Sequence, residues 1–188
     1  MSGAQALLVD FDGTLADTGA ANFAAYAHAL GEVGLTLERA SFDRVAFGRS
    51  WRQFLPELLS QHGIMADPKA IADRKAAIYP NYFDLVGLNT ALLRMMTAHR
   101  AHGGPVALVT TASGVNVRAI LQHFDLTGLF DTIVTGDDVV RHKPDPEAYH
   151  LAAERLRVRP ADCIVIEDSL IGMEAGRAFG APVLRVVI

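Results

Sequence analysis

Two aspartates, Asp10 and Asp12, flank a single residue at the end of a short apolar run near the start of the chain. In an extended strand alternate residues share a face, so both carboxylates could meet one site. Gly13 follows and permits a turn that a side chain would hinder. Such a pair suits phosphoryl transfer, because one carboxylate can attack phosphorus while the other protonates the leaving oxygen. Two anions approach each other only with a cation between them, so this chemistry also needs a hard cation such as Mg²⁺ near the aspartates. For either aspartate alone, an ordinary Asp-Gly turn is the alternative.

Polar residues also follow later apolar runs. Thr110, Thr111 and Ser113 come after one run and precede a helical pattern, where they could bind an anion or simply cap the helix. Lys143 could neutralise a phosphoryl group, or it could be a solvated loop lysine. The pair Glu167–Asp168 could hold a metal, or it could be an acidic helix start.

The elements that must position these residues alternate between strand and helix. Short apolar runs bounded by Gly, Pro, Asp or Ser predict buried strands at 6–11, 105–111, 132–135, 162–167 and 183–187. Amphipathic patterns predict helices at 90–102, 115–124, 146–156 and 170–179. Alternation of this kind indicates an α/β fold with a parallel, Rossmann-like sheet sandwiched by helices. Ligands of such sheets bind outside the carboxyl ends of the strands, where the polar residues gather.

The segment from residue 18 to residue 86 interrupts this alternation. Its apolar spacing predicts helices at 20–33, 51–62 and 68–83, and we find no convincing strand pattern in it. We therefore expect two domains: a core formed by residues 1–17 and 87–188, and a small helical domain formed by residues 18–86.

Composition excludes several classes of protein. The net charge of −4 and the lack of a basic block argue against a nucleic-acid surface. No apolar run reaches the roughly 18 residues of a membrane span. The single cysteine, Cys163, rules out an internal disulfide and fits a cytoplasmic location. We expect no nucleic-acid or membrane partner, and we leave open whether the chain is a monomer or a homodimer.

The nonapeptide Asp10–Thr18 resembles the first motif of haloacid dehalogenase superfamily phosphatases. The resemblance implies that Asp10 is the nucleophile, that Asp12 is the general acid/base and that the Asp12 carbonyl binds Mg²⁺. Dehalogenases of the superfamily lack the second aspartate, because no alkoxide leaving group needs a proton. Asp12 therefore favours phosphoryl transfer over dehalogenation.

Three later segments resemble the remaining motifs of that superfamily, in the same order: 106–113, 142–149 and 164–176. The resemblance implies that Thr110 hydrogen-bonds a phosphoryl oxygen, with Thr111, Ser113 and nearby amides assisting. It implies that Lys143 offsets the charge of nucleophile and phosphoryl group. It also implies that Asp168 completes the Mg²⁺ shell and that Glu167 binds the metal directly or through water.

The resemblance further implies that residues 18–86 are a helical cap of the β-phosphoglucomutase and phosphoglycolate phosphatase branch, with hinges at 17–18 and 84–87. Mutases of that branch carry a histidine where this chain has Asn22, and an arginine after Gly-x-Ser where it has Trp51. Both differences weaken a mutase interpretation. Candidate substrate contacts in the cap are Asn22, Arg49, Trp51, Arg52 and Lys75, with solvated helix charges and a core tryptophan as the alternative.

These observations predict a Mg²⁺-dependent phosphatase that hydrolyses a small phosphorylated metabolite through an aspartyl-phosphate on Asp10. A β-phosphoglucomutase-like sugar phosphomutase is the first alternative. A phospho-aspartate signalling module is the second, although it would need neither the long helical insert nor the acid Asp12.

Overall fold

The computed structural model describes residues 5–46, 49–186 and 188. The chain divides into two compact units, one formed by the residues up to Asp17 and from Gly87 onward, the other by Thr18–Val86. Among the described residues, no helix has both the length and the hydrophobicity needed to cross a bilayer.

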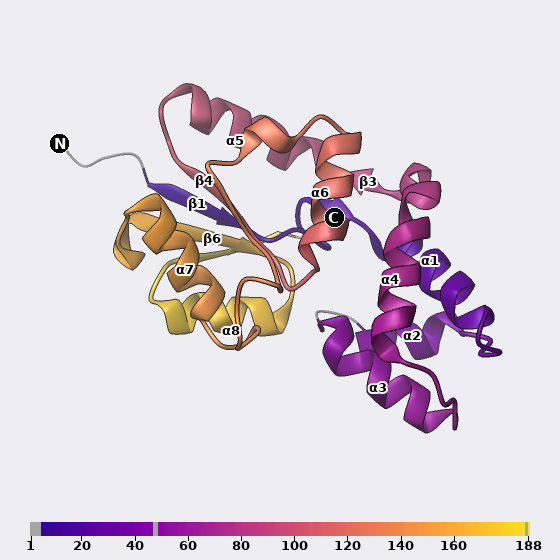
Figure 1. The fold of residues 1–188 in the computed structure, drawn as a ribbon. Coiled ribbons are helices and arrows are strands. Elements are labelled where there is room, and N and C mark those ends of the chain that lie inside the picture. Colours follow the sequence, from indigo (N-terminus) through magenta and orange to yellow (C-terminus); the bar gives the residue numbers. More distant parts are fainter. Residues whose placement is uncertain (1–4, 47–48, 187) are drawn as a thin grey trace. The chain divides into compact units, whose positions relative to one another are not determined.

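The first unit is built on a five-stranded sheet whose strands all run parallel (Figure 1). The strand order across the sheet is β5 (Thr132–Val134), β4 (Val106–Val109), β1 (Ala6–Val9), β6 (Cys163–Glu167) and β7 (Val183–Arg185). The central strand β1 is buried along its whole length, as is β4. Continuous apolar strands of this kind need cover on both faces, and the α/β sheet expected from the sequence is confirmed.

Helices cover both faces of this sheet. Figure 1 shows α5 (Thr90–Ala101) and α6 (Gly114–His123) on one face, and α7 (Glu147–Leu156) and α8 (Leu170–Phe179) on the other. Short 3₁₀ helices, η2 (Thr127–Leu129) and η3 (Pro160–Asp162), precede β5 and β6. On the second face, a buried cluster joins Leu8 and Val165 of the strands to Tyr149 and Phe179 of the helices. The core therefore lies between the sheet and α7–α8 as well as under α5–α6.

The strand β1 stops earlier than the sequence predicted, at Val9 instead of Phe11. The chain turns because the Phe11 carbonyl accepts hydrogen bonds from the backbone N–H groups of Thr14, Leu15 and Ala16, at 3.3, 3.0 and 2.9 Å. Gly13 has a φ of +89°, which is favourable for glycine alone. Asp10 therefore continues the strand ladder, whereas Asp12 is placed by a tight turn beyond the strand and not by strand alternation.

Two very short strands close this unit where the chain leaves it and returns. β2 (Ala16–Asp17) pairs antiparallel with β3 (Gly87–Leu88), with Asp17 opposite Gly87. Just beyond the ladder, the Asn89 N–H donates to the Leu15 carbonyl at 2.9 Å. Residues separated by the whole helical insert therefore lie side by side.

The second unit consists of helices, and no strand occurs among its described residues. Its elements are α1 (Gly19–Gly31), α2 (Arg39–Ala46), α3 (Trp51–Gln61), α4 (Pro68–Ile78) and the 3₁₀ helix η1 (Tyr79–Leu85). Its interior is aromatic: the ring of Tyr26 lies 5.6 Å from that of Phe42 and 5.2 Å from that of Phe54, centroid to centroid. Ser50 begins α3 with a capping box, and Asp67 caps α4 through the Lys69 N–H.

Two features of this unit differ from the sequence prediction. The helix α2 was not predicted, although Phe42 and Val45 are its buried face and Arg39 pairs with Asp43 one turn later. The helix predicted at 68–83 ends at Ile78, and the chain continues as the tighter η1. Pro80 explains this change, because proline offers no backbone N–H to an α-helical hydrogen bond.

Candidate active site

Three carboxylates come together at the carboxyl ends of the two central strands. Asp10 follows β1 and remains tied to the neighbouring strand, because its N–H donates to the Ile166 carbonyl at 2.9 Å. Glu167 ends β6, and Asp168 follows it directly. One ligand oxygen from each of these three side chains lies within 4.8 Å of the others. The parallel pairing of β1 with β6 therefore brings the two ends of the sequence to one site.

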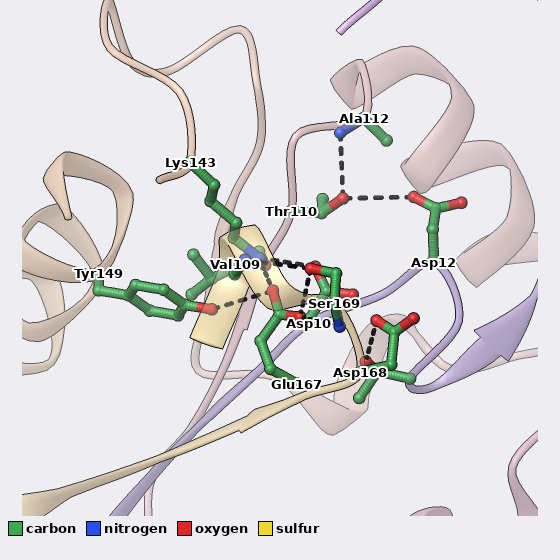
Figure 2. A network of polar contacts seen from close by, with 12 residues as sticks. Asp10, Asp12, Val109, Thr110, Ala112, Lys143, Tyr149, Glu167, Asp168 and Ser169 are labelled. Carbon is green, nitrogen blue, oxygen red and sulfur yellow. Dashed lines mark hydrogen bonds and ion pairs between the residues drawn. The ribbon is translucent and has the colours of Figure 1, made fainter. Parts of the chain in front are cut away.

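Lys143 fixes two of these carboxylates (Figure 2). Its ammonium donates to Asp10 Oδ1 at 2.7 Å, to Glu167 Oε1 at 2.6 Å and to the Val109 carbonyl at 3.0 Å. The three contacts use all three protons of the ammonium group. The lysine side chain is only 3% exposed, so its position is set by the protein and not by solvent.

Glu167 is held by four donors. Its Oε1 accepts from Lys143 and, at 3.3 Å, from the Tyr149 hydroxyl. Its Oε2 accepts from the Ser169 N–H at 3.0 Å and from the Ser169 hydroxyl at 2.9 Å. The glutamate also lies against the backbone of α8, because a β-carbon at Gly172 would overlap its carboxylate. The orientation of this carboxylate is therefore fully determined by the fold.

Burial dominates the electrostatics of the site. It raises the pKa of Asp10 well above the usual range; Lys143 opposes this shift, and the charges of Glu167 and Asp12 add to it. For Lys143, burial favours the neutral amine, but the charges of Asp10 and Glu167 outweigh it and raise the pKa of the ammonium well above its usual range. Burial likewise raises the pKa of the Tyr149 phenol. Tyr149 is therefore a neutral hydrogen-bond donor.

Asp168 is supported by the turn that follows β1. The Thr14 hydroxyl donates to Asp168 Oδ1 at 3.1 Å, and Gly13 lies directly beneath the carboxylate, where a β-carbon would overlap it. Partial burial and the charge of Glu167 raise the pKa of Asp168. The first and last predicted motifs are thus joined through side chains as well as through the sheet.

Asp12 and Thr110 form a second contact at the same edge of the sheet (Figure 2). The Thr110 hydroxyl donates to Asp12 Oδ2 at 3.4 Å and accepts from the Ala112 N–H at 3.0 Å. Thr110 also continues the ladder beyond β4, because its N–H donates to the Val134 carbonyl at 3.0 Å. The hydroxyl is thereby aimed at the carboxylate of Asp12.

Thr111 and Ser113 lie half-buried just beyond Thr110, before α6. Ser113 occupies the N-cap position of α6 without a capping bond from its side chain. The first N–H of the helix, that of Gly114, donates to the Asp137 carboxylate at 2.8 Å. A role in substrate binding for Thr111 and Ser113 stays a prediction.

The candidates in the helical unit have partners within that unit. Asn22 donates to the Thr18 hydroxyl at 3.0 Å, and Arg49 pairs with Glu57 at 2.8 Å. The guanidinium of Arg52 lies 4.6 Å from the ring centroid of Trp51. Lys75 is buried, with its ammonium 3.2 Å from the ring centroid of Tyr79. Substrate contact by Asn22, Arg49, Trp51 or Lys75 stays a prediction, and Gly48, which precedes Arg49, lies outside the described residues.

Two residues of the site were not singled out from the sequence, namely Tyr149 and Thr14. Tyr149 lies in α7, six residues after Lys143, and Thr14 lies within the first motif. Neither spacing predicts a contact, since the Tyr149 contact depends on how α7 packs against the sheet. For Tyr149 the sequence offered one signal. The apolar pattern of its helix predicts that the side chain is buried, and a buried tyrosine hydroxyl usually has a hydrogen-bond partner.

The donor set fits a hard divalent cation. The site gathers the carboxylates of Asp10, Glu167 and Asp168 beside the ammonium of Lys143. The carboxylate of Asp12 lies at the same edge of the sheet, in contact with Thr110. An excess of buried negative charge calls for additional positive charge, and carboxylate and carbonyl oxygens are the ligands that Mg²⁺ prefers. No sulfur or imidazole ligand lies in this cluster among the described residues, so the softer metals are disfavoured.

The chain matches one family of hydrolases over most of its length and is similar to phosphatases. The model of the haloacid dehalogenase-like hydrolase family matches residues 7–186. The chain is similar to the fructose-1-phosphate phosphatase YqaB of Escherichia coli, with 31% identity over 96% of this chain and 95% of that protein. It is also similar to the phosphorylated carbohydrates phosphatase of Thermotoga maritima, with 30% identity over 94% of this chain and 82% of that protein.

A solved structure shares the fold. The crystal structure of CbbY from Rhodobacter sphaeroides in complex with phosphate has a TM-score of 0.91 and 24% sequence identity. The similarity covers 99% of this chain and 87% of that one. At this level of identity the likeness speaks for the fold alone.

Proposed function

Because the chain belongs to the haloacid dehalogenase-like hydrolase family, we propose that it is a Mg²⁺-dependent phosphatase that forms an aspartyl-phosphate on Asp10. The observation that carries this proposal is the contact of Asp10 with Lys143, in a cluster with Asp168 and Glu167. A buried carboxylate held by an ammonium at the edge of a parallel sheet is positioned as a nucleophile toward an incoming anion.

The names of two relatives support a proposal for the substrate class. These relatives are named as phosphatases of fructose 1-phosphate and of phosphorylated carbohydrates, and each aligns over most of its length. We therefore propose that this chain acts on a small sugar phosphate. In the helical unit, Asn22, Arg49, Trp51 and Lys75 are the proposed contacts for the sugar.

In the proposed reaction, the free oxygen of Asp10 attacks phosphorus in line with the departing sugar oxygen. Lys143 keeps Asp10 oriented and offsets the negative charge shared by the nucleophile and the phosphoryl oxygens. Thr110, with Thr111, Ser113 and the nearby amides, would bind phosphoryl oxygens. These groups stabilise charge where it develops in the transition state.

Asp12 supplies the proton. In its acid form it protonates the sugar oxygen as that oxygen leaves, and as a carboxylate it then removes a proton from the water that hydrolyses the aspartyl-phosphate. The Thr110 hydroxyl, which donates to the Asp12 carboxylate in the structure, would turn to the phosphoryl oxygen when the substrate binds.

The residues that would hold Mg²⁺ are Asp10 and Asp168, with Glu167 binding the metal directly or through water. The family resemblance adds the backbone carbonyl of Asp12 to this set. The bound cation would supply positive charge that lets the anionic Asp10 approach the anionic phosphate.

The test is phosphate release from fructose 1-phosphate, glucose 6-phosphate and p-nitrophenyl phosphate in the presence of Mg²⁺. We expect release from at least one sugar phosphate, and a loss of at least about 10³-fold in Asp10→Asn and in Asp12→Asn. Thr97→Val, an exposed change on α5, is the matched control and should retain activity. Unchanged release by Asp10→Asn would refute the proposal.

The mutase alternative has its own outcome in the same assay. With β-glucose 1-phosphate as substrate, a mutase would yield glucose 6-phosphate with little free phosphate, whereas the proposed phosphatase yields glucose and phosphate. Chromatography of the sugars beside the phosphate measurement separates the two.

A further inference from the structure

Tyr149 is fully buried beneath the site and yet carries a polar group. It lies in α7, and its hydroxyl donates to Glu167 Oε1 at 3.3 Å. The centroid of its ring lies 5.1 Å from the ammonium of Lys143. Tyr149 therefore contacts both members of the ion pair behind the nucleophile (Figure 2).

We propose that Tyr149 is a positioning residue for phosphoryl transfer: it holds Glu167 and Lys143 so that the ammonium stays on Asp10. The inference rests on the proposed function, since it assigns a role in the same reaction. Tyr149 acts through these two side chains.

The hydroxyl completes the set of donors around Glu167. A carboxylate offers about four lone-pair sites, and Glu167 uses them for Lys143, Tyr149 and the N–H and hydroxyl of Ser169. With Oε2 held by Ser169, the rotation of Oε1 is set by Lys143 and Tyr149. Without the phenol, one site of a nearly fully buried carboxylate would be unpaired, and Glu167 could turn and draw Lys143 with it.

The aromatic ring of Tyr149 helps to hold Lys143 in place. Its face is an electron-rich surface beside the ammonium, and such contacts strengthen when both groups are desolvated. It also fills the space behind Lys143, so that the lysine cannot retreat from Asp10. Close packing transmits such a constraint, because a void would let the ion pair shift.

A purely structural role is the competing explanation. Tyr149 belongs to the buried cluster between the sheet and α7–α8, where its ring lies 6.0 Å from that of Phe179. Phe179 is 3% exposed and belongs to the same cluster, and it lies at the far end of α8 from Ser169. Phe179→Leu therefore removes comparable packing without touching the ion pair.

The experiment compares Tyr149→Phe, Tyr149→Leu and Phe179→Leu in steady-state hydrolysis of p-nitrophenyl phosphate with saturating Mg²⁺, alongside thermal unfolding of each variant. We expect Tyr149→Phe to lose about tenfold in kcat with KM nearly unchanged, because it loses one hydrogen bond to a charged group. We expect Tyr149→Leu to lose about 10²-fold, as for a misplaced catalytic group. Phe179→Leu should lower Tm yet retain kcat.

Two results would overturn the inference. One is a kcat of Tyr149→Phe and Tyr149→Leu equal to that of the wild type. The other is a kcat loss in Phe179→Leu as large as in Tyr149→Leu at equal folded fraction. Either result, with activity still abolished by Asp10→Asn, would leave the proposed function intact. Activity that survives Asp10→Asn would instead refute the proposed function itself.

Discussion

Gly13 lies directly against the carboxylate of Asp168, so that any side chain at position 13 would occupy the space of the Asp168 oxygens. The contact joins the turn after the first strand to the residue after the last central strand, 155 positions away in the sequence. The proposed metal site therefore requires glycine at position 13.

We predict that Gly13→Ala displaces Asp168 and abolishes most activity. Gly13 has a φ of +89°, so alanine adds backbone strain to the overlap. Gly103→Ala is the matched control, since Gly103 has a φ of +78° and nothing within 4 Å of its would-be β-carbon. Phosphate release and thermal unfolding measure both variants. Equal loss of activity in the two would show that strain alone is responsible.

Metal binding should stabilise the folded chain. We predict that adding Mg²⁺ to protein stripped with EDTA raises Tm, because a ligand that binds only the folded state stabilises it by about 2.7 kcal/mol at a hundredfold excess over Kd. In Asp168→Asn the shift should be much smaller, since one ligand of the cluster is lost. A full shift in this variant would contradict the assignment of Asp168 to the metal.

Removing Lys143 should leave buried charge without a partner. We predict that Lys143→Met, measured in EDTA, lowers the free energy of unfolding by about 3–5 kcal/mol, because Asp10 and Glu167 then lose their shared cation.

The double variant Lys143→Met/Glu167→Gln tests the cause of this loss. It should recover part of the stability, since one of the unpaired charges is gone, while phosphate release stays absent. Chemical denaturation measures both variants. A double variant less stable than Lys143→Met would argue that Glu167 stabilises the fold independently of the lysine.

Asp138 should make stability depend on pH at the acid end. Partial burial acts to raise its pKa, but hydrogen bonds from Arg155 and from the N–H and hydroxyl of Thr135 outweigh it, so the folded-state pKa is lowered. A lowered pKa means that this stabilisation is present above the unfolded-state pKa, about 3.9, and is lost as pH falls through the folded-state value.

We therefore predict that Asp138→Asn is less stable than the wild type at pH 7 and that the difference shrinks below about pH 4. Glu174→Gln, an exposed change on α8, controls for the loss of a surface carboxylate. Urea unfolding at pH 7, 5 and 3 measures the effect. A difference that grows toward low pH would contradict the lowered pKa.

Much of the core could be predicted from the sequence because its signals are local. The apolar runs before Asp10, Thr110 and Asp168 are too short for helices, and they are the buried strands β1, β4 and β6. Since parallel strands align their carboxyl ends, the polar residues after them were expected at one edge. The cluster of Asp10, Glu167 and Asp168 has this origin.

What the sequence did not predict depends on packing at a distance. The contacts of Tyr149 with Glu167 and of Thr14 with Asp168 join segments whose mutual approach no local pattern encodes. The helix α2 was missed because its buried face is only Phe42 and Val45, too few apolar positions to show a period. The strands β2 and β3 have two residues each, fewer than any pattern can identify.

The short ladder of β2 and β3 lies where the chain leaves the core and where it returns. Asp17 and Gly87 are directly paired on neighbouring strands. The two ends of the helical segment therefore leave the core side by side, about 5 Å apart, which is the usual spacing of paired residues in an antiparallel ladder. A tight hairpin turn would bridge the same gap without moving a single strand of the sheet. We therefore expect that the 69 residues between them, Thr18–Val86, can be exchanged for another segment while the strands of the sheet keep their register.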